Sequence, residues 1–238
     1  MKIALIPARA GSVRVKDKNI KLLGDMPLIA HTINAAIASL CYDRVIVVTD
    51  SAEYADIANK YGAEVPALRP THTASSEAAD ITWVSWFHNL MLSENTVAQS
   101  YSILRPTSPF RTKNTFQRAF ELFQSRPDID TLRAVQRVSE HPGKMWVQKA
   151  GNIVPLLPFS GDQDFWHNSQ TNTLPSVFVQ NASFEILKPR NIETFGSITG
   201  SNIVGFETQA YEGFDINSPS DFAEAERIYA ELSAKNVK

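Results

Sequence analysis

A cluster of basic residues follows the first apolar segment of the chain, in the stretch "IPARAGSVRVKDKN" at positions 6–19. Between positions 9 and 21, five Lys and Arg side chains stand against one Asp: Arg9, Arg14, Lys16, Lys18 and Lys21. Most charge runs are solvated surface. Here Gly11 and Ser12 also allow close backbone approach, so the loop has the residues needed to hold a polyanion such as a triphosphate.

The glycine content of this loop excludes two common nucleotide motifs. Gly11 is its single glycine, whereas the P-loop and the dinucleotide fingerprint need several glycines at fixed spacing. The whole chain has a net charge of −2, which does not favour a nucleic-acid partner because such proteins usually carry a strongly basic face. Any anion is therefore expected to be held locally, by this loop.

Composition and length predict one soluble globular domain. The chain has 238 residues, 43% of them hydrophobic and 20% charged, which is ordinary for a folded α/β protein. Cys41 is its single cysteine, so an internal disulfide and a multi-cysteine metal site are excluded. No run approaches about 18 apolar residues, and Met1 leads directly into a predicted strand. We expect a cytoplasmic protein with no membrane partner.

Alternating strands and helices predict a mostly parallel sheet. Short β-branched apolar runs at 2–8, 44–50 and 100–106 are typical of buried strands, and helical periodicity occurs at 27–40, 51–62, 81–91 and 116–123. Such βαβ units bind ligands beyond the carboxyl ends of the strands. The basic loop, Asp50 and the 105–111 loop all follow predicted strands there.

The sequence after Arg133 differs in texture and predicts an excursion from the sheet. It is rich in Pro, Asn, Ser and aromatic residues, with a probable hairpin turn at 150–152. Four large apolar side chains in it need a partner surface, which favours a subdomain or dimer arm: Met145, Trp146, Phe159 and Trp166. The chain then returns through strands at 177–187 and 202–207 and closes with a helix that Ser218 caps.

Five collinear motifs resemble one enzyme family. The segments "LIPARAGSVRVKDKNIKLLGDMPLIAHTINAAI", "RVIVVTDS", "KYGAEVPALRP", "LRPTSPFRT" and "YEGFDINSPSDFAEAE" are similar to the acylneuraminate cytidylyltransferases, the synthetases of CMP-sialic acid and related CMP-nonulosonic acids. The resemblance implies a Rossmann-like nucleotidyltransferase fold, with a mostly parallel mixed sheet flanked by helices. It also implies a single domain over 1–238, with a projecting dimerisation arm at 139–176, and a homodimer.

The same resemblance implies the reaction and the nucleotide site. The family transfers CMP from CTP to an acidic α-keto sugar with Mg²⁺ and releases pyrophosphate. The matched nucleotide-binding positions are Ala8, Arg9, Gly11, Ser12, Arg14, Lys18, Asn19, Thr107 and Ser108. Arg9 and Lys18 would also serve catalysis, and Asn19 would brace the loop. Val13 stands where the family commonly has Lys, and Arg14 is a candidate for the missing charge.

Several acceptor-side positions depart from the family. Arg105 replaces the usual Gln and is predicted either as a substrate contact or as a surface residue, and Val179 replaces a basic residue. The remaining candidates for substrate binding are Arg111, Lys144, Gln180 and Asn181.

The "GFDINSPSD" motif implies a magnesium site. Its first and third positions are usually Asp; here Asp215 matches, as a metal ligand and catalytic residue, and Asn217 takes the third place as a neutral oxygen ligand. The alternative is that both residues only shape the loop before the last helix.

Two other functions stay open at this point. The departures from the family would fit a nucleotidyltransferase that uses a sugar phosphate and another NTP. A non-catalytic sugar-nucleotide binding protein is the second alternative, against which Arg9, Lys18 and Asp215 argue.

Overall fold

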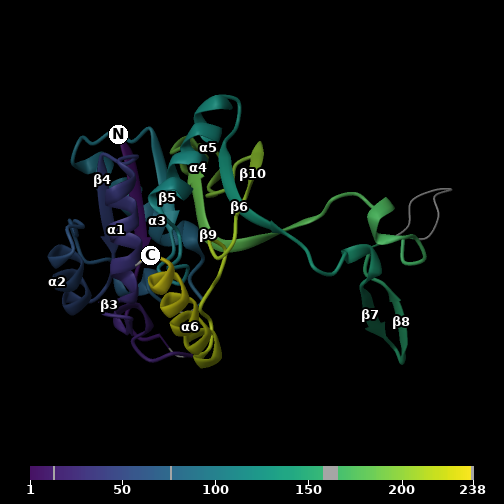
Figure 1. Ribbon diagram of the computed structural model, residues 1–238. Helices are drawn as coiled ribbons and strands as arrows, with labels where there is room; N and C mark the ends of the chain where they lie inside the picture. Colours follow the sequence, from purple (N-terminus) through teal and green to yellow (C-terminus); the bar gives the residue numbers. More distant parts are fainter. Residues whose placement is uncertain (13, 76, 158–165, 237–238) are drawn as a thin grey trace. The chain divides into compact units, whose positions relative to one another are not determined.

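The computed structural model describes residues 1–12, 14–75, 77–157 and 166–236 (Figure 1). They form two compact units: unit 1 comprises Met1–Ala134 and Asn181–Lys238, and unit 2 comprises Val135–Gln180. The predicted departure at Val13 and the predicted apolar contribution of Phe159 lie outside the described residues.

A mixed sheet forms the centre of unit 1. Within the described residues, its six strands are ordered β10-β6-β9-β5-β1-β4. Strand β1 (Lys2–Pro7) pairs in parallel with β4 (Arg44–Val48) and β5 (Ser100–Leu104), and β9 (Phe178–Leu187) pairs antiparallel to β5. Strands β6 (Thr131–Arg137) and β10 (Ile203–Glu207) complete it. The predicted mostly parallel α/β sheet is confirmed.

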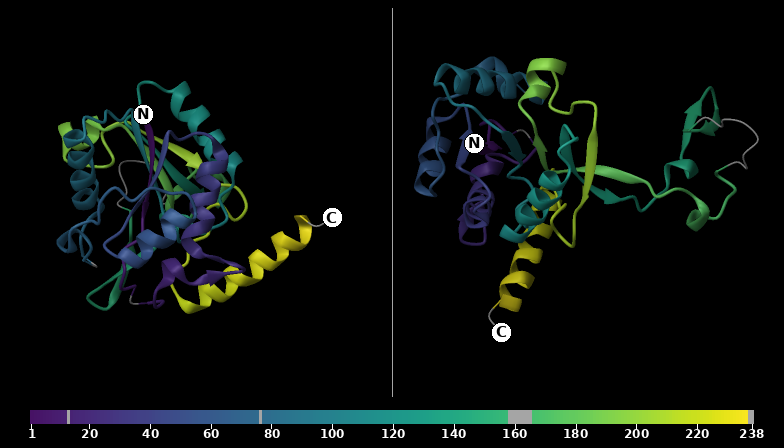
Figure 2. Two further views of the ribbon diagram at one scale, coloured as in Figure 1. Left: turned by 90° about the vertical axis from the view of Figure 1, so that its left-hand side faces the viewer. Right: turned by 90° about the horizontal axis from the view of Figure 1, so that it is seen from above.

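Helices cover both faces of this sheet because its strands are apolar on both sides. Ala4 and Ile6 point into a core shared with α1 (Leu28–Ser39), α2 (Ala52–Lys60) and α4 (Lys113–Ser125). Ile3 and Leu5 point into the opposite core, formed with α3 (Asp80–Ser93) and α5 (Arg190–Phe195). Figure 2 shows the sheet between these two layers. The sheet edge at the carboxyl ends of β1, β4 and β5 is thereby held rigidly.

A third, smaller core attaches the last helix to the N-terminal segment. Strands β2 (Leu22–Leu23) and β3 (Met26–Pro27) pair beside α6 (Pro219–Asn236), and Leu23, Leu28, Ile216 and Phe222 are buried together there. At Gly24 the φ angle is +65°, and a Cβ atom would lie 2.1 Å from the Tyr229 ring of α6. Only glycine therefore fits this turn.

The helix cap predicted at Ser218 is confirmed. The Ser218 hydroxyl accepts from the Asp221 N–H at 3.2 Å, while the Asp221 carboxylate accepts from the Ser218 N–H at 2.8 Å, a reciprocal capping box at the start of α6. Ser51 caps α2 by accepting from the Tyr54 N–H at 3.3 Å. Pro27 ends β3 and is the N-cap residue of α1.

Short elements complete the chain. Four 3-10 helices occur in the described residues: η1 (Lys18–Ile20), η2 (Thr71–Thr73), η3 (Pro142–Lys144) and η4 (Thr171–Thr173). Cys41 is buried. No helix in the described part of the chain has the length and apolar character needed to span a membrane.

Unit 2 contains the predicted hairpin. Strands β7 (Trp146–Lys149) and β8 (Asn152–Pro155) pair antiparallel around Ala150 and Gly151, whose φ angles are +49° and +83°. Two consecutive positive φ angles are typical of the tight turn that matches strand twist. Trp166, which was expected to need a partner surface, packs edge-on against His141 within the unit, with ring centroids 6.1 Å apart.

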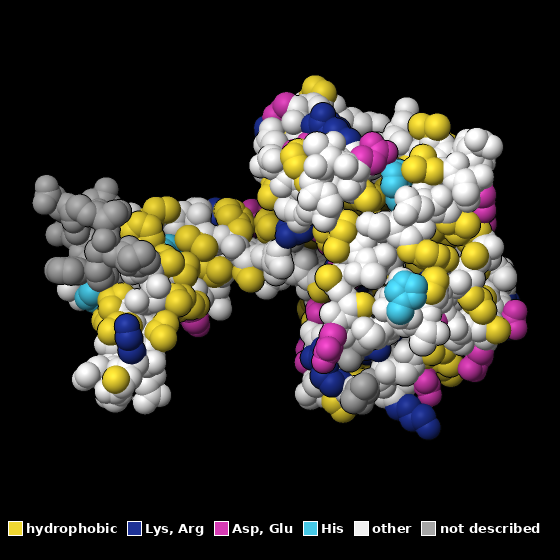
Figure 3. All heavy atoms as spheres, turned by 180° about the vertical axis from the view of Figure 1, so that it is seen from behind, with side chains coloured by type: hydrophobic (Ala, Val, Ile, Leu, Met, Phe, Trp, Pro, Cys, Tyr) yellow, Lys and Arg dark blue, Asp and Glu magenta, His cyan; other side chains and the backbone are white. Residues whose placement is uncertain are grey.

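Much of the remaining apolar surface of unit 2 is exposed. Figure 3 shows hydrophobic side chains gathered on it. The exposed members are Met145, Trp146, Val147, Ile153, Val154, Leu156, Phe178 and Val179. Single exposed apolar residues are normal on soluble proteins, but a concentration of them marks a surface that contacts a partner.

Candidate active site

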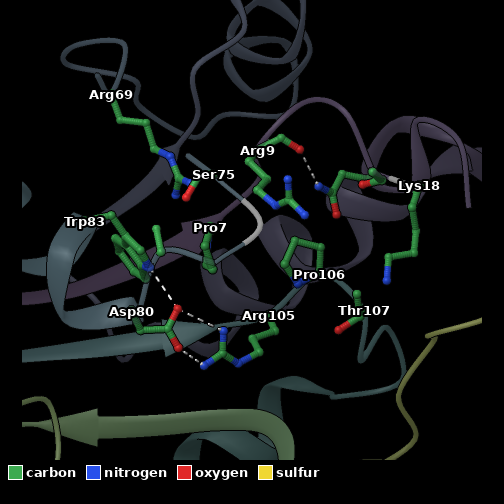
Figure 4. A pocket seen from close by; sticks show the side chains of 13 residues that line it. Pro7, Arg9, Lys18, Arg69, Ser75, Asp80, Trp83, Arg105, Pro106 and Thr107 are labelled. Carbon is green, nitrogen blue, oxygen red and sulfur yellow. Dashed lines mark hydrogen bonds and ion pairs between the residues drawn. The ribbon is translucent and has the colours of Figure 1, made fainter. Parts of the chain in front are cut away.

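A polar pocket lies at the carboxyl ends of β1 and β5 (Figure 4). It has a volume of about 230 Å³. Its walls come from the loop after β1, the segment that leads to α3, the first turns of α3 and the loop after β5. The lining residues are Pro7, Arg9, Ser12, Lys18, Asn19, Arg69, Ser75, Ala78, Asp80, Trp83, Arg105, Pro106 and Thr107.

The basic loop forms one wall of the pocket, as the sequence predicted for part of it. Arg9, Ser12, Lys18 and Asn19 line the cavity, while Arg14 is exposed and outside the lining. The Asn19 amide donates to the Arg9 carbonyl at 3.2 Å, and this bond closes the loop on itself. The loop therefore has internal support for presenting its cations.

Two further features fix the conformation of this loop. The Ala10 N–H donates to the Asp50 carboxylate at 2.8 Å, which ties the loop to the end of β4. Gly11 has a φ angle of +71° with open space around it, so the backbone conformation rather than crowding favours glycine there. Ala8 is buried at the start of the loop and packs in the core.

Lys18 joins the basic loop to the loop that carries Asp215. Its ammonium donates to the Ile216 carbonyl at 2.6 Å. Burial lowers the pKa of Lys18; the Asp215 carboxylate opposes this shift, and the Arg14 charge adds to it. The lysine is thus a partly desolvated donor, whose charge acts more strongly on a bound anion than in bulk water.

Arg105 is held by carboxylates of the chain itself, as Figure 4 shows for Asp80. Its guanidinium donates to both oxygens of Asp80, at 2.5 and 3.5 Å, and lies 3.4 Å from Glu185. Glu185 in turn accepts from Arg133 at 2.6 Å. Burial, the largest single effect, would lower the pKa of Arg105, but the bond to Asp80 and the charges of Asp80, Glu185 and Asp215 together raise it. Arg105 is therefore neither a free surface residue nor an uncompensated cation.

The Asp215 carboxylate, which is not among the residues lining the pocket, has one hydrogen-bonded and one unpartnered oxygen. Its Oδ2 accepts from the Asn217 amide nitrogen at 2.5 Å, whereas its Oδ1 is buried and has no hydrogen-bond partner among the described residues. Between them in sequence, the Ile216 N–H donates to the Thr107 carbonyl at 2.9 Å. Asn217 thus holds Asp215 through its nitrogen, and Thr107 ties this loop to the pocket wall.

Two residues predicted as ligand contacts are buried instead. Arg111 is 3% exposed; its guanidinium donates to the carbonyls of Ser183 and Arg105 and to the Thr32 hydroxyl. Ser108 is fully buried. The chain turns into the protein interior after Thr107. Ser108 and Arg111 therefore lie beneath the pocket loop and do not line the pocket.

Two of the acceptor-side candidates, Asn181 and Lys144, make hydrogen bonds within their own units. The Asn181 amide donates to the Thr208 hydroxyl at 2.9 Å, and its oxygen accepts from the Ser183 N–H. In unit 2 the Lys144 ammonium donates to the Ser169 carbonyl at 2.6 Å and the His167 carbonyl at 3.3 Å. Gln180 is an exposed residue of β9 that belongs to unit 2. Asn181, the one of these residues in unit 1, is not among the residues that line the pocket.

Sequence reasoning missed part of the pocket. Arg69, Ser75, Asp80 and Trp83 all line it. Arg69 is 5% exposed, and its backbone N–H donates to the Thr49 carbonyl at the end of β4. Asp80 accepts from the Trp83 indole at 2.9 Å across the first turn of α3. That i, i+3 spacing at a helix start was a readable signal, because it places both side chains on one face.

Residues 3–142 match the sequence model of the cytidylyltransferase family. The chain belongs to this family. It is 32% identical to CMP-N,N'-diacetyllegionaminic acid synthase of Legionella pneumophila, over 95% of each chain. It is also 39% identical to N-acylneuraminate cytidylyltransferase of Escherichia coli over 57% of this chain and 31% of that one. The protein is a nucleotidyltransferase.

Solved structures agree on the fold. CMP:2-keto-3-deoxy-manno-octonic acid synthetase complexed with CTP superposes with a TM-score of 0.71 over 97% of this cytidylyltransferase and 99% of that chain, at 14% identity. The 4-diphosphocytidyl-2C-methyl-D-erythritol synthase of Anaerococcus prevotii superposes with a TM-score of 0.63, at 13% identity. The predicted nucleotidyltransferase fold is confirmed.

The buried position of Arg111 generates a stability prediction. Arg111→Met should lower the free energy of unfolding by about 3 kcal/mol, because two carbonyls and a hydroxyl inside the protein lose a charged donor. Chemical denaturation measures this. The control is Arg126→Met, since Arg126 is an exposed arginine bonded to Asp128 and its loss should change stability little. A normal unfolding midpoint with a raised KM in Arg111→Met would instead mean that Arg111 contacts the substrate.

Proposed function

We propose that the pocket of unit 1 binds CTP and that this cytidylyltransferase transfers CMP to a hydroxyl of a sialic-acid-like nonulosonic sugar. The observation that carries the proposal is the cluster of Arg9, Lys18 and Arg69 around one cavity, in a chain of net charge −2. The likeness to a CMP-legionaminic acid synthase over 95% of both chains supports a nonulosonic acceptor.

The proposed reaction is an in-line substitution at the α-phosphorus. The sugar hydroxyl oxygen forms a bond to that phosphorus and loses its proton to water, the bond to the bridging oxygen breaks, and pyrophosphate leaves with the electron pair. Phosphoryl and nucleotidyl transfer depend mainly on positioning and on neutralising charge at the phosphates. Arg9, Ser12 and Lys18 supply donors and charge for this, on a loop that Asn19 and Asp50 hold in place.

The residues at Asp215 fit a magnesium ion supplied with the nucleotide. The buried Oδ1 of Asp215 lacks a partner among the described residues, which suits a cation ligand. The described residues contain no group of three or more His, Cys, Asp and Glu that could hold a metal, so phosphate oxygens and water would complete the coordination. When bound, Mg²⁺ would stabilise charge on the phosphates and lower the pKa of the attacking hydroxyl.

A substrate screen tests the proposed function directly. Pyrophosphate release is measured with each of the four common NTPs against a panel of nonulosonic acids and sugar phosphates. Release with CTP and a nonulosonic acid supports the proposal. Release with a sugar phosphate, or with another NTP in preference to CTP, would replace it with the related nucleotidyltransferase. No release with any pair, despite CTP binding, would favour a sugar-nucleotide binding protein. We place the enzyme in the cytoplasm, where CTP is available.

The position of Lys18 predicts a loss of activity. Lys18→Ala should remove most turnover, because the variant loses a partly buried ammonium at the phosphates and a tie to Ile216. Steady-state pyrophosphate release checks this, and thermal melting checks the fold. Lys16→Ala is the matched control: it removes an exposed lysine from the same loop and should retain activity. Near-normal turnover in Lys18→Ala would contradict the role of the basic loop in phosphate binding and would mean that it is solvated surface.

The Asn217 amide generates a prediction about metal binding. Asn217→Asp should lower the Mg²⁺ concentration needed for half-maximal rate, because a second carboxylate would then face the ion. Without metal this variant should melt at a lower temperature than wild type, because two carboxylates would repel each other where wild type has a 2.5 Å hydrogen bond. Mg²⁺ should restore the melting temperature. Asp215→Asn should nearly abolish turnover. Identical Mg²⁺ titrations for wild type and Asn217→Asp would mean that this position does not face the metal.

We further propose that unit 2 is the contact of a homodimer, because its hairpin exposes Trp146 and Ile153, the latter by 63%. Sedimentation at micromolar concentration should give twice the 26.5 kDa of one chain. Ile153→Asp should shift the protein to monomer, whereas Leu92→Asp, at a 50% exposed position of unit 1, should not. A fully active monomer of the wild type would contradict the dimer.

A further inference from the structure

The segment that carries Asp215 keeps its shape without a helix or strand of its own. It runs from the end of β10 at Glu207 to the start of α6 at Pro219. Two successive turns form its first half: the Glu212 N–H donates to the Gln209 carbonyl at 2.9 Å, and the Phe214 N–H donates to the Tyr211 carbonyl at 3.0 Å. Something outside the segment must hold these turns in place.

One residue in the first turn adopts an unfavourable backbone conformation. Ala210 has a φ angle of +46°, in the left-handed region that side chains with a Cβ rarely occupy. Such a conformation persists only where the surroundings impose it, and it concentrates at functional sites.

Glu212 supplies the restraint. Its carboxylate accepts from Arg118 at 2.6 and 2.7 Å, from the Thr115 hydroxyl at 2.7 Å and from the Gln209 N–H at 2.8 Å. The side chain is only 12% exposed, so these charge-assisted bonds are shielded from water. Its own carbonyl accepts from the Ser183 hydroxyl at 2.6 Å. Glu212 therefore fastens the turn to α4 and to β9 at once.

The helix that holds Glu212 also follows the pocket wall. Helix α4 starts directly after the loop of Arg105 to Thr112, and the Thr115 hydroxyl that donates to Glu212 accepts from the Thr112 N–H at 3.0 Å. On the far side of Asp215, the Ile216 N–H donates to the Thr107 carbonyl of the same loop. Asp215 thus lies between Glu212, which is bonded to the first turns of α4, and Ile216, which is bonded to the pocket loop that precedes α4.

We infer that Glu212, through Arg118 and Thr115, is a positioning residue that fixes Asp215 relative to the pocket. The inference rests on the proposed function of Asp215 and assigns Glu212 no contact with substrate. Without the brace, the turn at Ala210 relaxes toward negative φ and the Asp215 carboxylate is displaced. A displaced ligand weakens the metal-dependent step while the cations that bind the triphosphate remain in place.

The test compares two glutamates that each bind an arginine. Glu212→Gln should lower kcat and raise the half-saturating Mg²⁺ concentration, by roughly 10- to 100-fold as is usual for residues that orient metal ligands. The Kd of CTP without metal should not change. Glu224→Gln is the control: Glu224 is exposed on α6 and accepts from Arg227 at 2.7 and 2.9 Å. This variant should match wild type in all three measurements.

A rescue and a coupling experiment separate positioning from general stability. Glycine adopts positive φ freely, so Ala210→Gly in the Glu212→Gln background should recover part of the lost turnover, and alone it should leave turnover unchanged. Arg118→Gln should show a smaller loss, and the double variant with Glu212→Gln should be no worse than Glu212→Gln itself. Additive losses, or a rescue that raises only the melting temperature, would overturn the inference.

Hydrogen exchange gives a readout that needs no turnover. Amides of residues 211–217 should exchange faster in Glu212→Gln than in wild type and should be unaffected in Glu224→Gln. If wild type releases no pyrophosphate with any substrate, the proposed function fails while this measurement still decides whether Glu212 braces the segment. Unchanged amide exchange rates at residues 211–217 in Glu212→Gln would contradict the positioning role of Glu212. If that variant does not fold, Arg118→Gln serves for the same measurement.

Discussion

The backbone of Ile216 is the point on which the site depends. Its N–H donates to the Thr107 carbonyl and its carbonyl accepts from the Lys18 ammonium, so one buried residue connects three loops, including a contact across 198 positions of sequence. The Ile216 side chain is fully buried in the core that α6 forms with Leu23 and Leu28. Apolar packing of the last helix against the N-terminal segment thereby sets the distance between the basic loop and Asp215. A rigid core determines where the polar groups meet.

The distribution of charge around the pocket explains how a mildly acidic chain offers a site for a polyanion. Asp80 and Glu185 compensate Arg105, and Glu185 also accepts from Arg133. Burial, the largest single effect, would raise the pKa of Asp80, but its bonds to Arg105 and Trp83 and the charges of Arg105 and Arg69 together hold that pKa below its usual value, so the pair stays ionised. Arg9, Lys18 and Arg69 then remain as the cations that give the cavity its excess charge. The pocket thus combines an excess of positive charge with one compensated Arg105–Asp80 pair, which suits a polyanionic ligand.

The sequence predicted which residues lie near the carboxyl edge of the sheet better than it predicted which of their side chains are buried. Buried β-branched runs predicted β1, β4 and β5, and the cap at Ser218 predicted the start of α6, because these signals are local. Arg111 and Ser108 share a motif with Thr107, yet the chain turns inward after Thr107 and buries them. The ion pairs of Arg105 could not be predicted from the sequence either. Its partners Asp80 and Glu185 are 25 and 80 positions away, and neither separation follows from a helical or strand period.

The amide of Asn217 shows how one substitution changes the demands on a metal site. Two carboxylates at 2.5 Å would repel each other in the absence of a cation, whereas the amide donates to Asp215 and keeps the motif ordered without one. For the proposed Mg²⁺, the unpartnered oxygen of Asp215 would be a single charged ligand, too few for the six oxygens around the ion. In the proposed reaction, most of the coordination must come from phosphates and water, so metal affinity depends on the nucleotide already being in the pocket. Correct placement of the one carboxylate matters correspondingly more, which is why the ties at Ile216 and Glu212 on either side of Asp215 carry the geometry of the site.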